Sequence, residues 1–182
     1  MNRRAIIVID LQNEYLADGK LPLVGMESAV ANAARIIGAA RARGEPVIHV
    51  LHENPGSKAT FFMPGTPGVG IIPQVGPTQG EQVVVKHHPN AFRDTQLQET
   101  LRAQDVGAVV VLGAMSHMCV DATARASADL GYEVTVVEDA CATMDINYGA
   151  RFVSASQVHA AHVAALAFAY ASVVSTDTLL SG

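Results

Sequence analysis

Short runs of β-branched apolar residues alternate along the chain with longer amphipathic or alanine-rich segments. Uninterrupted runs of this kind are typical of strands that are buried on both faces. The predicted strands cover residues 5–9, 46–51, 81–85, 109–112, 132–137 and 171–175. Helical spacing predicts helices over residues 27–43, 95–103, from about 118 to a stop at 131, and 155–169. The alternation predicts an α/β fold in three layers: a doubly wound, mainly parallel six-stranded sheet with helices on both faces, a Rossmann-like arrangement.

One long segment between the second and third predicted strands has neither pattern. Residues 55–80 contain five prolines and several glycines. A loop of this length in a compact domain commonly serves as a lid or binding loop. Phe61, Phe62 and Met63 supply apolar anchors, so we expect a lid at about residues 53–81 over the functional site. A dimer contact is the alternative use.

Composition and charge narrow the class of protein. With 49% hydrophobic and 16% charged residues, the 182-residue chain predicts one globular domain over residues 1–182. The net charge of −5 and the scattered basic residues argue against binding to nucleic acid or to a membrane surface. No run of apolar residues is long enough to span a membrane. The start of the chain has no cleavage site and two cysteines are too few for a disulfide scaffold, so a cytoplasmic location is expected. No GxGxxG follows the first strand, which disfavours a dinucleotide-dependent oxidoreductase.

Three polar residues follow the carboxyl ends of predicted strands. Asp10 ends the first strand, Lys86 ends the third, and Cys119 begins the helix after strand 109–112. If these strands are central neighbours, the three side chains converge at one edge of the sheet. The helix dipole and Lys86 would then favour a nucleophilic thiolate, Asp10 would move a proton, and backbone N–H groups would form an oxyanion hole. The alternatives are a buried core cysteine, a turn-capping aspartate and an edge lysine that reaches water.

The segments around these residues read IIVIDLQNEY, VVVKHHPNAF and VVLGAMSHMCVDATARASADLGYEV. Together with EDACAT, the late His159 and the last strand, they resemble the isochorismatase-like hydrolase superfamily, in its cysteine-hydrolase branch of nicotinamidase-related amidases. The resemblance extends over essentially the whole chain. It implies a catalytic triad of Asp10, Lys86 and Cys119. It also implies a cis peptide between Ala114 and Met115, with the N–H groups of Met115 and Cys119 as the oxyanion hole.

The resemblance also implies a reaction. Cys119 would form a thioester with a small amide, carbamoyl or lactam-type substrate, and Asp10 would pass the thiol proton to the leaving nitrogen. Nicotinamidases hold a metal with an Asp-x-His element that VLHENPG lacks, so we predict no metal and no other cofactor. Isochorismatases that cleave a vinyl ether lack the cysteine, so Cys119 favours C–N cleavage. The alternatives are such an ether hydrolase, or a non-catalytic ligand-binding or redox-sensing member of the fold.

Several further residues near strand ends or in the long loop are candidates for contact with a small-molecule substrate. They are Gln12, His52, Phe61, Asn90, Phe92 and His117. His159 and His162 have a metal-like spacing on a helix, but two ordinary histidines are the more common case. Family members often complete the pocket with a neighbouring subunit. Together with the alanine-rich helices, this predicts a homodimer or homotetramer.

Overall fold

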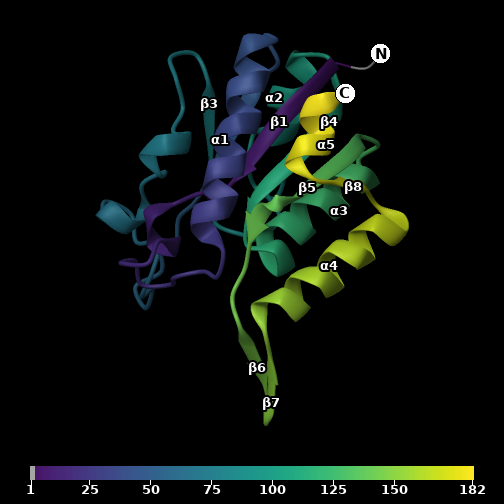
Figure 1. Cartoon of the computed structure of the whole chain (residues 1–182). Helices are drawn as coiled ribbons and strands as arrows, with labels where there is room; N and C mark the ends of the chain where they lie inside the picture. The colour runs from purple at the N-terminus through teal and green to yellow at the C-terminus, as the bar shows by residue number, and fades with distance from the viewer. Residues whose placement is uncertain (1–2) are drawn as a thin grey trace.

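A parallel sheet of six strands, in the order β3-β2-β1-β4-β5-β8, forms the centre of the molecule in the computed structural model, which describes residues 3–182 (Figure 1). The strands are β1 (Arg3–Ile9), β2 (Val47–His52), β3 (Gln82–Lys86), β4 (Val106–Ala114), β5 (Glu133–Ala142) and β8 (Ser172–Val174). This arrangement confirms the predicted fold class. Residues 1 and 2 of the predicted single domain lie outside the described residues.

Helices cover both faces of the sheet. On one face lie α1 (Met26–Ala42) and α5 (Thr176–Ser181); on the other lie α2 (Leu97–Ala103), α3 (Asp121–Asp129) and α4 (Ala155–Ala169). Alternate residues of β1 enter different cores: Ile6 packs with the α1 layer, and Ile7 packs with the opposite layer. A strand with two apolar surroundings must be apolar throughout, which explains the continuous run at 5–9. Within residues 3–182, no helix is both long and apolar enough to span a membrane.

The boundaries differ from the predicted ones mainly around the site. Strand β4 continues through Gly113 to Ala114, and β5 extends through the EDACAT segment to Ala142. A π-helical turn, Ser116–Val120, then precedes α3. A hairpin of β6 (Ile146–Tyr148) and β7 (Arg151–Val153), which the sequence does not predict, projects from the body of the molecule (Figure 1). Its strands are three residues long, too short for a recognisable period.

Gly113 permits the close approach of β4 to β1 directly before Asp10. Its φ of 124° lies in the region that favours glycine, and an added Cβ would overlap the carbonyl oxygen of Ile9. We therefore expect Gly113→Ala to lower the free energy of unfolding by about 2–4 kcal/mol in urea denaturation. Gly44→Ala is the matched control, because Gly44 also has a positive φ but has open space around its Cβ position. Equal losses in the two variants would contradict the role of the close approach.

Candidate active site

The polar residues at the carboxyl ends of the first four strands meet in one cluster. Asp10 follows β1 and Cys119 follows β4, at the point where the strand order reverses, which is where open α/β sheets bind their ligands. The Nζ atom of Lys86 lies 2.7 Å from Oδ2 of Asp10 and 3.2 Å from Sγ of Cys119. The structure therefore brings together all three residues that the sequence singles out.

Lys86 reaches this cluster from the edge of the sheet rather than from a central strand. Strand β3 is outermost, and β2 separates it from β1, a spacing of roughly 10 Å between β3 and β1. The long lysine stem crosses the end of β2, and the side chain has no exposed surface. The interpretation of Lys86 as an edge lysine that reaches water is therefore wrong.

The backbone at Asp10 turns sharply as it leaves β1. Its φ is 50°, a left-handed conformation that aspartate tolerates better than most residues. The N–H of Asp10 donates to the carbonyl of Val50, and the carbonyl of Asp10 accepts from the N–H of Gln12. These bonds hold the carboxylate at the sheet edge, where it is fully buried and pairs with Lys86 rather than capping the turn.

The cluster places one cation beside two groups that could each become an anion. Burial raises the pKa of the Asp10 carboxyl, against the opposing charge of Lys86. Burial and the charge of Asp10 raise the pKa of the Cys119 thiol, although Lys86 opposes this. One ammonium supports one neighbouring anion better than two, so we expect Asp10 and Cys119 to share a single proton at neutral pH. The expectation that the helix start lowers the pKa of the thiol is therefore wrong for this site, because burial and Asp10 outweigh the dipole.

Cys119 lies in the π-helical turn that follows β4. The peptide bond between Ala114 and Met115 is cis, as the family resemblance implies. The N–H groups of Met118 and Val120 both donate to the carbonyl of Met115, which closes the turn around Cys119. Met115 directly precedes this turn and Cys119 lies within it, and the role of their N–H groups as an oxyanion hole stays a prediction.

A residue pair that no sequence pattern indicates supports the same turn. The hydroxyl of Ser116 lies 2.7 Å from Nδ1 of His159 on α4 and 3.3 Å from the carbonyl of Ala142 at the end of β5. The two residues are 43 positions apart, so local sequence reasoning has no means of finding them. His162, one turn further along α4, lies instead against Asp121. The two histidines therefore have different partners rather than a common metal position.

The long loop at 53–81 is docked on the segment that follows Asp10. Gln12 is fully buried: its Oε1 accepts from the N–H of His52, and its Nε2 donates to the carbonyls of His52 and Val69. These bonds occupy both amide hydrogens and the carbonyl, so Gln12 anchors the loop and leaves no donor for a substrate, contrary to its predicted role. The carboxylate of Glu14 accepts from the N–H of Phe62 and adds a second anchor.

Aromatic rings line the contact between this loop and the cluster. The buried ring of Phe62 lies edge-on to Tyr15, 5.0 Å between centroids, and 5.5 Å from the ring of His52. Phe61 packs on Phe62 at 5.7 Å and stays half-buried. Burial, together with the charges of Asp10 and Cys119, raises the pKa of Tyr15 well above its usual value. Sequence reasoning missed Tyr15, because an aromatic residue in a turn has no distinguishing pattern.

Three other predicted substrate contacts have different surroundings. Asn90 accepts the N–H of Phe92 and so caps its own turn. Phe92 stacks on Tyr132, 6.2 Å between centroids, and Tyr132 precedes β5 at the opposite edge of the sheet. This stacking engages one face of the half-buried Phe92 ring, and its contact with substrate stays a prediction. His117 is half-buried and lies 2.6 Å from the hydroxyl of Thr143, and its contact with substrate stays a prediction.

One group of side chains has donor atoms that could hold a metal ion. Oxygen, nitrogen and sulfur atoms of Asp10, His52 and Cys119 lie within 4.8 Å of one another. Nζ of Lys86 lies within 3.2 Å of each of them, with His52 Nδ1 at 2.8 Å. These donors already surround a cation, the lysine ammonium, and a metal ion would have to displace it. The prediction of no metal cofactor is retained for this reason.

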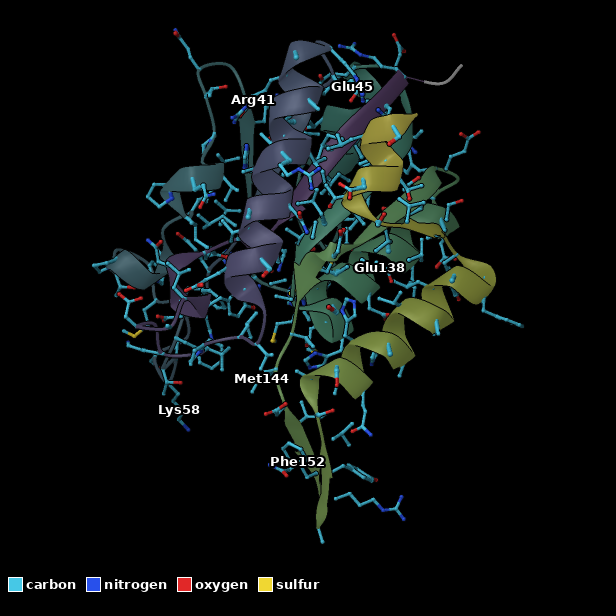
Figure 2. All side chains as sticks on the ribbon, viewed as in Figure 1. Arg41, Glu45, Lys58, Glu138, Met144 and Phe152 are labelled. Carbon is cyan, nitrogen blue, oxygen red and sulfur yellow. The ribbon has the colours of Figure 1, made fainter. Side chains whose placement is uncertain are left out.

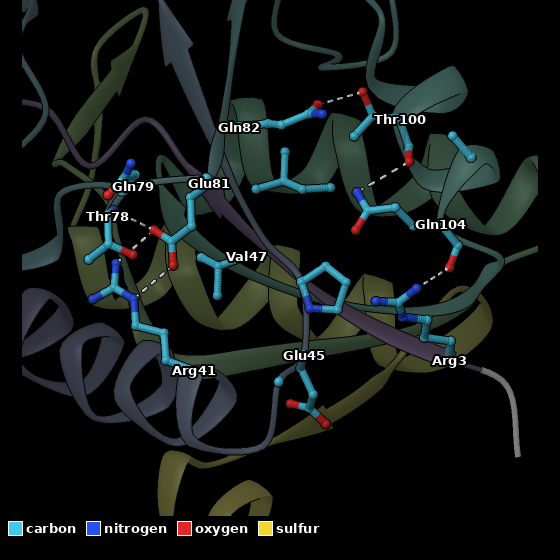
Figure 3. Close-up of a pocket in the computed structure, with 15 residues that line it drawn as sticks. Arg3, Arg41, Glu45, Val47, Thr78, Gln79, Glu81, Gln82, Thr100 and Gln104 are labelled. Carbon is cyan, nitrogen blue, oxygen red and sulfur yellow. Dashed lines mark hydrogen bonds and ion pairs between the residues drawn. The ribbon is translucent and has the colours of Figure 1, made fainter.

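A cavity of about 600 Å³ lies at the other, amino-terminal edge of the sheet (Figure 3). Its charged side chains are engaged with neighbours: Arg41 pairs with Glu81 at 2.8 Å, and Arg3 donates to the carbonyl of Gln104. Burial alone would raise the pKa of Glu81. The hydrogen bonds from Arg41, Thr78 and His49 outweigh burial and lower that pKa to about 2. This cavity therefore offers paired charges without a nucleophile, and the cluster at the carboxyl edge is the candidate active site.

Comparisons with known proteins find a matching family model and several similar proteins and structures. Residues 4–178 match the model of the isochorismatase domain. An uncharacterized isochorismatase family protein of Bacillus subtilis, YddQ, is 46% identical over 97% of this chain and 98% of its own length. The crystal structure of an isochorismatase-type hydrolase from Oleispira antarctica superposes with a TM-score of 0.96 at 47% identity, covering 100% of this chain and 97% of that one. Streptothricin hydrolase of Streptomyces noursei is 35% identical over 79% of this chain and 51% of its own length. Nicotinamidase of Escherichia coli is 27% identical over 80% of this chain and 86% of its own length.

Proposed function

The chain belongs to the isochorismatase family of hydrolases, and we propose that it cleaves a C–N bond of a small amide, carbamoyl or lactam-type compound through a thioester on Cys119. The observation that supports this most is the contact of one buried ammonium with both a carboxylate and a thiol, 2.7 Å and 3.2 Å from Nζ of Lys86. Relatives named as a streptothricin hydrolase and a nicotinamidase support C–N chemistry in particular.

The proposed reaction begins with attack of the Cys119 sulfur on the substrate carbonyl carbon. Asp10 takes the thiol proton as the S–C bond forms, and the N–H groups of Met115 and Cys119 bind the resulting oxyanion. Asp10 then gives the proton to the leaving nitrogen, the C–N bond breaks, and an amine or ammonia departs. Water attacks the thioester while Asp10 takes its proton, and the sulfur leaves as the restored thiol. Lys86 stabilises whichever of the two groups is negative.

Exposure favours Cys119 as the group that meets substrate. Cys119 has 6% of its surface exposed, whereas Asp10 and Lys86 have none. A substrate that enters beside the 53–81 loop therefore reaches the sulfur first and the proton carrier behind it. This order suits a nucleophile in front and a general base behind.

The proposal is tested by acylation and by release of ammonia or amine. We expect p-nitrophenyl acetate to acetylate Cys119, visible as a mass increase of the peptide that contains it. A panel of primary amides, N-carbamoyl compounds and lactams should include at least one that is hydrolysed. Absence of acetylation at Cys119, or acetylation at Cys141 instead, would contradict the proposal. Cleavage of a vinyl ether but of no amide would support the ether-hydrolase alternative.

We further propose that two copies or more assemble through α4 and the β6–β7 hairpin. Phe168 on α4 is 90% exposed, and Tyr148 on the hairpin is 81% exposed. Phe152 on the same hairpin is 63% exposed (Figure 2). Phe168 lies near the carboxyl end of α4, and the hairpin precedes the amino end of the same helix, so exposed large apolar side chains mark both ends of this face as a protein contact. An isolated hairpin is also only marginally stable on its own. The two free cysteines also support a reducing, cytoplasmic location.

Light scattering should give the mass of a dimer or tetramer for the wild type. Phe168→Glu should shift that mass toward the monomer, because it replaces a 90% exposed apolar ring of the proposed contact by a charge. Leu130→Glu is the matched control, since Leu130 is also exposed, at 43%, but lies at the end of α3. A monomeric wild type, or the same shift in both variants, would argue against this interface.

A further inference from the structure

His52 ends β2, and its imidazole lies directly against the ammonium of Lys86. Nδ1 of His52 is 2.8 Å from Nζ, between the distances to Asp10 and to Cys119. A lysine ammonium has three hydrogens and no acceptor. Asp10, His52 and Cys119 together offer one acceptor for each hydrogen. The ammonium is therefore fully engaged, and one of its three partners belongs to neither reacting group.

The contact defines the protonation state of the histidine. Because an ammonium only donates, Nδ1 of His52 must be the acceptor, and the ring proton lies on Nε2. Burial and the charge of Lys86 lower the pKa of His52 to about 4. The titratable groups around the ring are Lys86, His87 and His88 after β3, together with Asp10 and Cys119. At neutral pH the ring is neutral and able to accept.

The position of the ring is held from two sides. The side chain of Gln12 accepts from the N–H of His52 and donates to its carbonyl, each at 2.9 Å. The ring of Phe62 packs 5.5 Å from the imidazole. The imidazole is therefore a rigid acceptor, placed by the segment that follows Asp10 and by the long loop.

We propose that His52 is a positioning residue that holds the Lys86 ammonium between Asp10 and Cys119 while the proton passes between them. This inference rests on the proposed function. Without an acceptor at Nδ1, one N–H of a buried ammonium loses its partner, and Nζ shifts toward the carboxylate, its strongest partner. The thiolate then loses stabilisation relative to the Asp10 anion. The binding of substrate does not depend on this contact.

The test compares three replacements of His52. In His52→Asn the side-chain oxygen can occupy the place of Nδ1, whereas in His52→Gln the same amide lies one methylene farther away, and His52→Leu has no acceptor. We expect His52→Leu and His52→Gln to lower the rate of Cys119 alkylation by iodoacetamide about 10- to 100-fold, with His52→Asn within about threefold of the wild type. Amide hydrolysis should show the same order in kcat, with KM nearly unchanged.

The alkylation assay needs no substrate, so it separates this inference from the proposed function. If the wild type hydrolyses no amide but the Asn and Gln variants still differ in alkylation, the proposed function fails and the role of His52 stands. Equal rates in the Asn and Gln variants would overturn the positioning role. An effect confined to KM would do the same, because it would place His52 on the substrate rather than on Lys86.

Discussion

Replacement of Cys119 by alanine is expected to abolish hydrolysis of any amide that the wild type cleaves, with kcat reduced about 10⁴-fold or more. The loss is this large because no other group of the cluster can form the thioester: Asp10 and Lys86 have no exposed surface, and Cys119 alone of the three has some, at 6%. Without the sulfur, Asp10 also has no thiol proton to accept and pass to the leaving nitrogen. Steady-state release of ammonia or amine measures the effect.

Cys141→Ser is the matched control for this prediction. Cys141 pairs in register with Gly113 on β4, so it lies on the neighbouring strand. Burial raises its pKa to about 12, and it lies outside the set of side chains that contact the Lys86 ammonium, which are Asp10, His52 and Cys119. We expect kcat to stay within about twofold of the wild type, since serine keeps the size of the side chain. Retained hydrolysis in Cys119→Ala would exclude the thioester and favour the ether-hydrolase or binding-protein alternatives.

Replacement of Asp10 by asparagine is expected to lower kcat about 10²- to 10⁴-fold, while Cys119 stays reactive toward iodoacetamide. The amide has the shape of the carboxylate but cannot carry a proton to the leaving nitrogen. The charge of Asp10 is one cause of the raised thiol pKa, so its removal lowers that pKa and leaves the thiolate as the counter-ion of Lys86. Turnover and thiol reactivity should therefore separate in this variant.

Asp129→Asn, an exposed change at the end of α3, is the control for the loss of one carboxylate. Wild-type turnover in Asp10→Asn would contradict the role of Asp10 as proton carrier. A simultaneous loss of turnover and alkylation would show that the variant disrupts the cluster as a whole, and circular dichroism would then report the accompanying change in fold.

The pattern of apolar residues was sufficient for the fold because each central strand lies between two helical layers. The run at 5–9 has to be apolar on both sides, and Ile6 and Ile7 do enter different cores. The short strands β6 and β7 escaped prediction because three exposed or half-buried residues carry no period. The predicted strand 109–112 ended too early, because β4 continues through Gly113, which permits the close approach of β4 to β1.

The cluster was predictable to the extent that strand ends locate side chains. Asp10 and Cys119 follow neighbouring strands, so topology alone brings them together. The raised pKa of the thiol was not predictable, because it depends on burial in the folded chain and on contact with Asp10. Gln12 and Phe92 show the same limit: both follow strand ends, but one is consumed by backbone bonds and the other stacks on Tyr132. Position along a strand does not reveal which neighbours a side chain finds.

The pH dependence of Cys119 alkylation tests most directly the claim that Asp10 and Cys119 share one proton beside Lys86. In the wild type, the fraction of thiolate is set by the partition of that proton, so the rate should be nearly constant between about pH 6 and pH 9. In Asp10→Asn the thiol titrates alone, so the rate should follow a single sigmoidal curve with pH. Wild-type Cys119 that titrates as a single thiol, with the same midpoint in Asp10→Asn, or that does not react at any pH, would contradict the account.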